Sequence, residues 1–184
     1  MFQLVLFGHL TAVALLFAAG GIALTTLLRI RDARDVAQLR IALGNGPLIS
    51  ILFPLASVGV IATGAALVKL AGIPVTTPWL DLSVALTLTL VVVGATVTGP
   101  RLQNVARAAA QAPGPALDAR LDELRNDPVM HLVELLSISE AVGLLFLMSN
   151  RPDAAGSLVT IAAALLGGLA TYTSRISAGR PLRR

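Results

Sequence analysis

The sequence has no cysteine and is poor in aromatic and charged residues. None of its 184 residues is Cys, which excludes disulfides and thiolate metal sites. Charged residues make up only 13%, whereas about a quarter of a typical soluble domain is charged. Aromatic residues make up 4%, so the side chains that stack on nucleic-acid bases are nearly absent. The net charge of +4 therefore does not indicate nucleic-acid binding. The basic residues are better explained by their positions beside membrane helices.

Hydrophobic residues, in contrast, make up 55% of the chain and occur in long runs. A soluble protein of this size keeps too much of its area on the surface to hide them. Runs of about 20 apolar residues are the length that a membrane-spanning helix needs. The sequence therefore predicts an all-α, polytopic membrane protein embedded in a lipid bilayer.

Five runs are long enough to span a bilayer, and we expect one integral membrane domain over residues 1–184. The first run could be mistaken for a signal peptide. It has no basic n-region, however, it exceeds the usual apolar length, and Arg29 follows it directly. We therefore interpret it as a true membrane helix. The expected spans are residues 2–28, 47–70, 79–98, 130–150 and 154–174.

The polar segments between the spans differ in length. Residues 29–40 are expected to form a short charged connection. Gly99 and Pro100 are expected to end the third span, although residues 101–111 could extend its helix beyond the bilayer. In the long loop 101–129, leucines recur at i, i+4 and i+7 within residues 116–125. This spacing predicts a short amphipathic helix that either lies on the membrane or docks on the bundle.

The fifth span is rich in small residues. Ala163 and Gly167 form one pair four residues apart, and Ala164 and Gly168 form another. Small residues at this spacing let two helices approach closely in a membrane. The pattern indicates helix packing and is not by itself a sign of function.

The distribution of arginine predicts the orientation of the chain. Of the 14 basic residues only Lys69 is a lysine, and with the abundant Ala, Gly and Pro this bias indicates a high-GC bacterial gene. Twelve basic residues fall on one side of the five spans, and only Lys69 and Arg151 fall on the other. The positive-inside rule then places the N-terminus outside and the C-terminus in the cytoplasm, for a multi-pass protein of the bacterial inner membrane. The twelve are Arg29, Arg31, Arg34, Arg40, Arg101, Arg107, Arg120, Arg125, Arg175, Arg180, Arg183 and Arg184.

Three motifs resemble those of a known family. They are GHL at residues 8–10 with the Gly pair at 20–21, GPRLQNVARAA at 99–109, and FLMSNRPD at 146–153. The chain is similar to a family of small bacterial predicted integral membrane proteins of unknown function (domain of unknown function 2269). More distantly it resembles the membrane region of copper-resistance D-type proteins. Relatives would have Lys before Pro152, where this chain has Arg151 and keeps the charge. The family resemblance implies no activity, and the distant one raises the possibility of metal or haem binding.

The fourth span carries polar residues that a lipid-facing helix would not. A charge near the bilayer centre costs roughly 2.5–3.5 kcal/mol on insertion scales. Glu140 lies near the middle of this span, with Glu134 and His131 toward its cytoplasmic end and Ser137 between the acids. At ~100° per residue the two acids are ~120° apart, so they share one broad face. We expect Glu140 to be protonated and to donate a hydrogen bond.

Two interpretations of these residues remain open. In the first, Glu140 is a neutral acid bonded to another helix, and Glu134 and His131 belong to the interfacial end. In the second, Glu140 binds or relays a proton or a cation, with Glu134 and His131 as the cytoplasmic part of the path. His9, in the first span, is at a similar depth to Glu140 and could bond to it. A His9–Glu140 bond predicts that His9→Ala and Glu140→Gln destabilise non-additively.

No cofactor, metal site or enzymatic activity is expected. His9 and His131 lie near opposite ends of their helices, so one chain cannot clamp a haem between them. Met1, Met130 and Met148 are scattered, which disfavours copper. The sequence contains no HExxH, GxSxG, P-loop or dinucleotide-binding motif.

The function that the sequence favours is a non-enzymatic accessory or partner-binding subunit. Its partner would be a second copy of the chain or another membrane protein. The alternative is proton-linked or cation transport through Glu140, Glu134 and His9, and a further alternative is metal or haem binding. Five spans without an internal repeat are few for a transporter monomer, so transport would require an oligomer.

Overall fold

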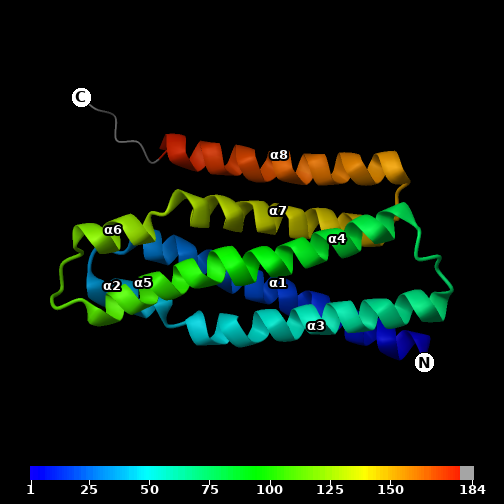
Figure 1. Ribbon diagram of the computed structural model, residues 1–184, viewed down its shortest axis with the longest axis horizontal. Helices are drawn as coiled ribbons and strands as arrows, with labels where there is room; N and C mark the ends of the chain where they lie inside the picture. Colours follow the sequence, from blue (N-terminus) through cyan, green and yellow to red (C-terminus); the bar gives the residue numbers. More distant parts are fainter. Residues whose placement is uncertain (179–184) are drawn as a thin grey trace. The chain divides into compact units, whose positions relative to one another are not determined.

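The computed structural model describes residues 1–178, and the side chains of residues 1–174. Arg180, Arg183 and Arg184, which entered the orientation argument, lie outside the described residues. The described chain contains helices and no strand, which confirms the all-α prediction (Figure 1). The elements are α1 (Phe2–Asp32), α2 (Val36–Leu43), α3 (Gly46–Ala71), α4 (Pro78–Val93), a π-helical turn η1 (Gly94–Thr98), α5 (Gly99–Gln111), α6 (Ala119–Arg125), α7 (Pro128–Asn150) and α8 (Ala154–Ala178).

Five stretches of helix in the described chain are long and apolar enough to cross a membrane, so the five-span prediction is confirmed. The chain is an integral, multi-pass membrane protein that lies in a lipid bilayer. Some stretches are longer than expected because extramembrane helices continue them. The orientation of the termini stays a prediction. The five stretches are Phe2–Asp32, Val36–Ala71, Pro78–Gln111, Ala119–Asn150 and Ala154–Ser174.

By its internal contacts the chain divides into two compact units. Unit 1 comprises residues 1–75 and 94–127, and unit 2 comprises residues 76–93 and the described residues from 128 to 178. The expectation of one membrane domain over 1–184 stays a prediction, and each unit is described by itself.

In unit 1, α1 and α3 pack side by side through small residues. A Cβ built at Gly59 would lie 3.0 Å from the Cβ of Ala12, which is tighter than ordinary contact. One built at Gly8 would lie 3.7 Å from Thr63 Cγ2. This is the close backbone approach that small residues permit between membrane helices, where lipid offers no hydrophobic driving force.

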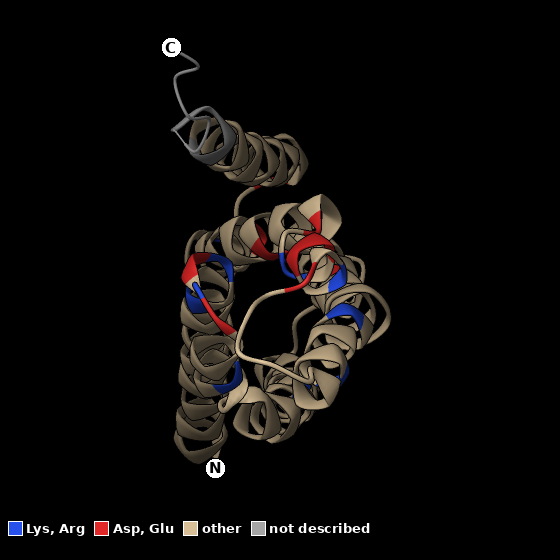
Figure 2. Cartoon of the chain, turned by 90° about the vertical axis from the view of Figure 1, so that its left-hand side faces the viewer, with Lys and Arg blue, Asp and Glu red and all other residues tan. Residues whose placement is uncertain are grey.

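The extramembrane end of unit 1 has a hydrophobic core of its own. Ile30, Val36 and Leu39 meet Val105 and Leu121 in one buried cluster, although about 90 residues of sequence separate its ends. Leu121 belongs to α6, the short amphipathic helix expected over 116–125, which begins three residues later than expected because Asp118 caps it. The helix packs against α5, and Leu121 joins the buried cluster with residues of α2 and α5, which agrees with docking on the bundle. Figure 2 faces this end and shows residues of both charges on it.

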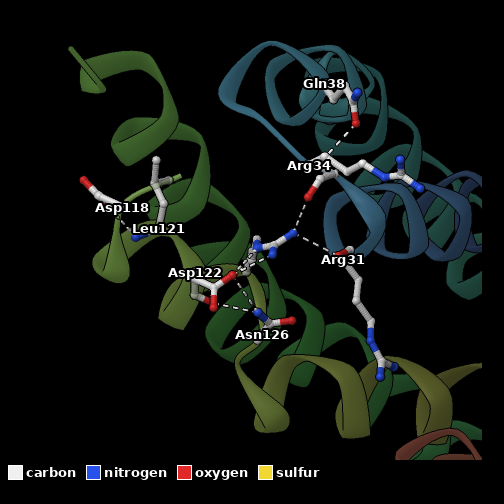
Figure 3. Close-up of polar contacts among 9 residues, drawn as sticks. Arg31, Arg34, Gln38, Asp118, Leu121, Asp122 and Asn126 are labelled. Carbon is white, nitrogen blue, oxygen red and sulfur yellow. Dashed lines mark hydrogen bonds and ion pairs between the residues drawn. The ribbon is translucent and has the colours of Figure 1, made fainter. Parts of the chain in front are cut away.

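Two arginines tie this end together by capping helix carbonyls. Arg125 Nη1 donates to the carbonyl oxygens of Arg31 (2.9 Å) and Ala33 (2.6 Å), at the end of α1 (Figure 3). Its Nε and Nη2 donate to Asp122 Oδ1. Arg40 Nε donates to the carbonyl of Ala109 at 2.9 Å, near the end of α5. These bonds satisfy carbonyls that a helix end leaves without donors. The segment 29–40 is therefore more than a charged connection: it contains the start of α2 and its cap Asp35.

The helix of the third span continues beyond Gly99 and Pro100, as the extension over residues 101–111 allowed, and the end of the span within the bilayer stays a prediction. The helix passes through the π turn η1 and continues as α5 to Gln111. Pro100 lacks an N–H, and a π turn before it is one way in which a helix absorbs the lost bond. A Cβ built at Gly99 would lie 3.0 Å from the Gly94 carbonyl oxygen, so the turn favours glycine there. Arg101 Nη1 donates to the Val97 carbonyl at 3.1 Å and supports the same turn.

In unit 2, α7 packs against both α8 and α4. A Cβ built at Gly168 would lie 2.9 Å from Leu136 Cδ2 and 3.1 Å from its Cα. Ala164 lies equally close to Gly143, whose added Cβ would be 3.0 Å from the alanine Cβ. Of the two small-residue pairs in the fifth span, Ala164 and Gly168 therefore face α7. The other pair is exposed, and Gly167 has nothing within 4 Å of its Cβ position.

Candidate polar cleft between α4 and α7

A small cleft lies between α4 and α7 of unit 2. Its volume is about 140 Å³, which is room for a few water molecules or the end of one polar side chain. The lining is mostly apolar, and its polar groups are Glu140, Ser137 and Thr89. The complete lining is Thr89, Leu90, Val93, Val133, Leu136, Ser137 and Glu140.

Glu140 is the only charged residue among those that line the cleft. It is half-buried, and its carboxyl makes no hydrogen bond or ion pair within the part of the chain that the structure describes. The Thr89 hydroxyl donates to the Ala85 carbonyl of its own helix at 2.9 Å, which leaves its lone pairs available. The cleft therefore offers a carboxyl and two hydroxyls to whatever enters it.

Glu134 lies about one and two-thirds turns before Glu140 on α7, with Ser137 between them. It is buried, with 8% of its surface exposed, and does not line the cleft. Among the described residues its carboxyl also has no hydrogen-bond partner. The two acids thus lie on one helix, and only Glu140 lines the cleft.

His9 is engaged inside unit 1. Its Nδ1 lies 3.0 Å from Thr63 Oγ1, across the α1–α3 contact. The Thr63 hydroxyl donates its one proton to the Gly59 carbonyl, so it accepts from His9 Nδ1–H. The hydrogen bonds thus assign the proton of a neutral His9 ring to Nδ1. His9 therefore makes a polar contact between α1 and α3. Its pairing with Glu140, which belongs to unit 2, stays a prediction.

His131 lies in the first turn of α7 and is half-buried. It shares that helix with Glu134, Ser137 and Glu140 but does not line the cleft. Of the five candidate residues from the sequence, the structure thus brings Glu140 and Ser137 together in one site.

The sequence analysis did not single out three polar positions that the structure makes notable: Thr63, Thr89 and Ser83. Hydroxyl residues are common in membrane helices because they bond to carbonyls of their own helix, so their presence alone gave no signal. Ser83 is the most unusual, because its hydroxyl oxygen is the one side-chain nitrogen or oxygen in the described chain that is completely shielded from solvent and has no hydrogen-bond partner.

The residues do not form a metal-binding cluster. In the described chain no group of three or more His, Cys, Asp or Glu side chains is placed to hold a metal ion. A calcium ion takes six to eight oxygen ligands, which one carboxyl and two hydroxyls do not supply.

Comparison with known proteins gives one match. The family model described as "predicted integral membrane protein (DUF2269)" matches residues 3–152, which is most of the chain and includes both sides of the cleft. No curated protein and no solved structure matches the chain. The distant similarity to copper-resistance D-type proteins therefore stays a prediction.

Proposed function

The chain belongs to this family of predicted integral membrane proteins, and from that premise we propose that it is a non-enzymatic, partner-binding membrane subunit. In this proposal the α4–α7 cleft receives a hydrogen-bonding group from a neighbouring membrane helix. That helix belongs to a second copy of the chain or to another membrane protein.

The observation that carries the proposal is the Glu140 carboxyl. It lines the cleft at mid-helix and makes no bond within the described residues. A carboxyl without a partner inside a membrane is costly, and polar side chains in membrane helices are commonly satisfied across a helix–helix interface. A donor brought by another helix would remove this cost, and the neighbouring Ser137 and Thr89 hydroxyls would add further bonds.

Photo-cross-linking in native membranes tests this proposal. A photoreactive residue at Leu90, which lines the cleft, should form an adduct with a second polypeptide, and Glu140→Leu should abolish it. The control is the same residue at Val84, which is 49% exposed on the same helix but does not line the cleft. The mass of the adduct distinguishes a second copy from another protein. Equal yields at Leu90 and Val84 would overturn the proposal.

A second candidate function is proton transfer along α7. It is favoured by the alignment of Glu134, Ser137 and Glu140 at intervals of three residues, from a buried acid to the cleft. Carboxyls and hydroxyls in such a row are the groups of intramembrane proton relays. A metal ion would need more ligands than these three side chains supply, whereas a proton would not.

Flux in proteoliposomes separates the two functions. Proton transfer predicts a proton flux in the wild type that Glu140→Gln abolishes. Glu123→Gln is the matched control, because Glu123 is exposed on α6 and should leave the flux unchanged. A folded wild type that shows no flux would exclude proton transfer and leave partner binding as the function of the cleft.

We also propose that the protein lies in the bacterial cytoplasmic membrane with its N-terminus outside. The support is the gathering of arginines at one end of the spans. Because the chain has no cysteine, single substitutions report cleanly on its topology. On intact cells an impermeant maleimide should label Val75→Cys, in the turn after α3, and not Ala116→Cys, in the turn before α6. The reverse pattern would invert the orientation.

A further inference from the structure

Six of the arginines at the extramembrane end of unit 1 fall into two groups. Arg40 and Arg125, the capping arginines, donate to helix carbonyls, and Arg101 Nε pairs with Asp127 Oδ2 at 3.0 Å. These three guanidinium groups have partners within the protein, so substituting them should change stability.

Arg29, Arg31 and Arg34, which we call the edge arginines, differ from these. They occur within six consecutive residues at the end of the first membrane-spanning helix. No ion pair or side-chain hydrogen bond involves their guanidinium groups among the described residues. In Figure 3 the side chains of Arg31 and Arg34 point away from Asp122, one of the two acids on the facing helix α6.

The nearest acids in sequence do not neutralise the edge arginines. Asp35 uses its carboxylate to cap α2, where it accepts from the Gln38 N–H at 2.7 Å. Asp32 is exposed and pairs with no arginine in the described chain. At this edge, three positive charges therefore have only Asp32 as a neighbouring acid in sequence that is not engaged in a helix cap.

The position of these charges identifies the chemistry of their partner. They follow directly on the apolar run of α1, which places them at the depth of lipid headgroups. Ile41, on the outer face of the adjoining helix α2, is 74% exposed, as an apolar anchor in the membrane interface would be. Guanidinium groups bind phosphate with two parallel hydrogen bonds.

We propose that the edge arginines bind the phosphate groups of anionic lipids at this end of the first span. Binding there would fasten the α1–α2 corner to the membrane surface. The occupant is a lipid, because only a lipid presents its phosphate at this depth beside an apolar surface for Ile41. This inference is independent of the cleft and of its partner.

Thermal unfolding in mixed micelles tests the proposal. Added phosphatidylglycerol should raise the Tm of the purified wild type, and phosphatidylcholine at the same concentration should not. The triple variant Arg29→Gln, Arg31→Gln, Arg34→Gln should lose this difference and keep its Tm in phosphatidylcholine. Each arginine should contribute roughly fivefold to the apparent affinity for the anionic lipid at low salt. If the triple variant folds poorly, Arg34→Gln alone should show a reduced rise, and Arg34→Lys should restore part of it.

The capping arginine Arg40 provides a control that matches Arg34→Gln in charge. Arg40→Gln removes one positive charge at the same end, and it should lower the Tm in both lipids while keeping the rise with phosphatidylglycerol. Inorganic phosphate at matched concentration should not reproduce the rise. The proposal is overturned if the triple variant keeps the full rise, if Arg40→Gln removes it equally, or if inorganic phosphate alone produces it.

Discussion

The two units differ in whether their ionisable intramembrane groups, His9 and Glu140, are hydrogen-bonded within the unit. In unit 1, His9 meets Thr63, and Thr63 in turn bonds to its own helix, so the polar contact is complete within the unit. In unit 2, Glu140 lines a cleft and has no bond in the described residues. A polar residue in a membrane helix can therefore have either of two roles. A polar group that is hydrogen-bonded within its unit joins two helices. A polar group without such a bond is available to a partner or a proton.

The units also differ in what holds their helices together. Unit 1 adds long-range side-chain bonds from Arg125 and Arg40 to the α1–α3 packing. Unit 2 joins α7 to α8 by close approach at Gly143 and Gly168. The following substitutions test this contrast, from the largest expected effect to the smallest.

Arg125→Leu should destabilise unit 1 by about 3 kcal/mol, because it leaves the carbonyls of Arg31 and Ala33 and the Asp122 carboxylate without their charged donor. The measurement is reversible unfolding in detergent. Arg120→Leu, at an exposed position on the same helix, should change stability by less than about 0.5 kcal/mol. Equal effects at the two positions would show that the caps contribute nothing.

Gly168→Ala should destabilise the α7–α8 contact by roughly 1–3 kcal/mol, because the added methyl meets the backbone of Leu136 at 3.1 Å. Gly167→Ala is the matched control: it adds the same methyl one residue away, where nothing lies within 4 Å. We expect it to be neutral or slightly stabilising, since alanine favours a helix. If both variants unfold alike, close approach at Gly168 is not what holds unit 2.

His9→Ala and Thr63→Ala should be non-additive by about 1 kcal/mol, because each removes the same hydrogen bond. The double-mutant cycle is measured by unfolding in detergent. A parallel cycle of His9→Ala with Glu140→Gln tests the pairing expected from the sequence. Coupling in the first cycle and none in the second would assign His9 to unit 1 alone, and the opposite result would join the two polar groups.

Ser83→Ala should have the smallest effect, neutral or stabilising by up to about 1 kcal/mol, because it removes a fully buried hydroxyl without a partner. Thr87→Val, one turn later on α4, is the comparison, since the Thr87 hydroxyl is bonded to the Ser83 carbonyl at 2.8 Å. Both are measured by thermal unfolding. A clear loss of stability with Ser83→Ala would mean that its hydroxyl has a partner in the membrane.

Much of the architecture followed from the sequence, for local reasons. A run of apolar residues long enough to cross a bilayer must form a helix, because lipid satisfies no backbone group. The five spans and the all-α class therefore needed no tertiary information. The amphipathic spacing near Leu121 also predicted its helix, because that pattern depends on only three leucines. Polar residues in the fourth span predicted candidate site positions. Two of them, Glu140 and Ser137, line the cleft, and their function stays a prediction.

Tertiary structure decided what each side chain meets. Whether Gly168 or Gly167 faces α7 depends on how the helix is rotated, and both carry the same small-residue signal. The partner of His9 is 54 residues away, and the carbonyls that Arg125 caps are more than 90 residues away. Spacing along a chain specifies which residues share a helix face. Which faces meet is set by packing between helices. Packing therefore decides which arginines bond to helix carbonyls and which have no partner among the described residues.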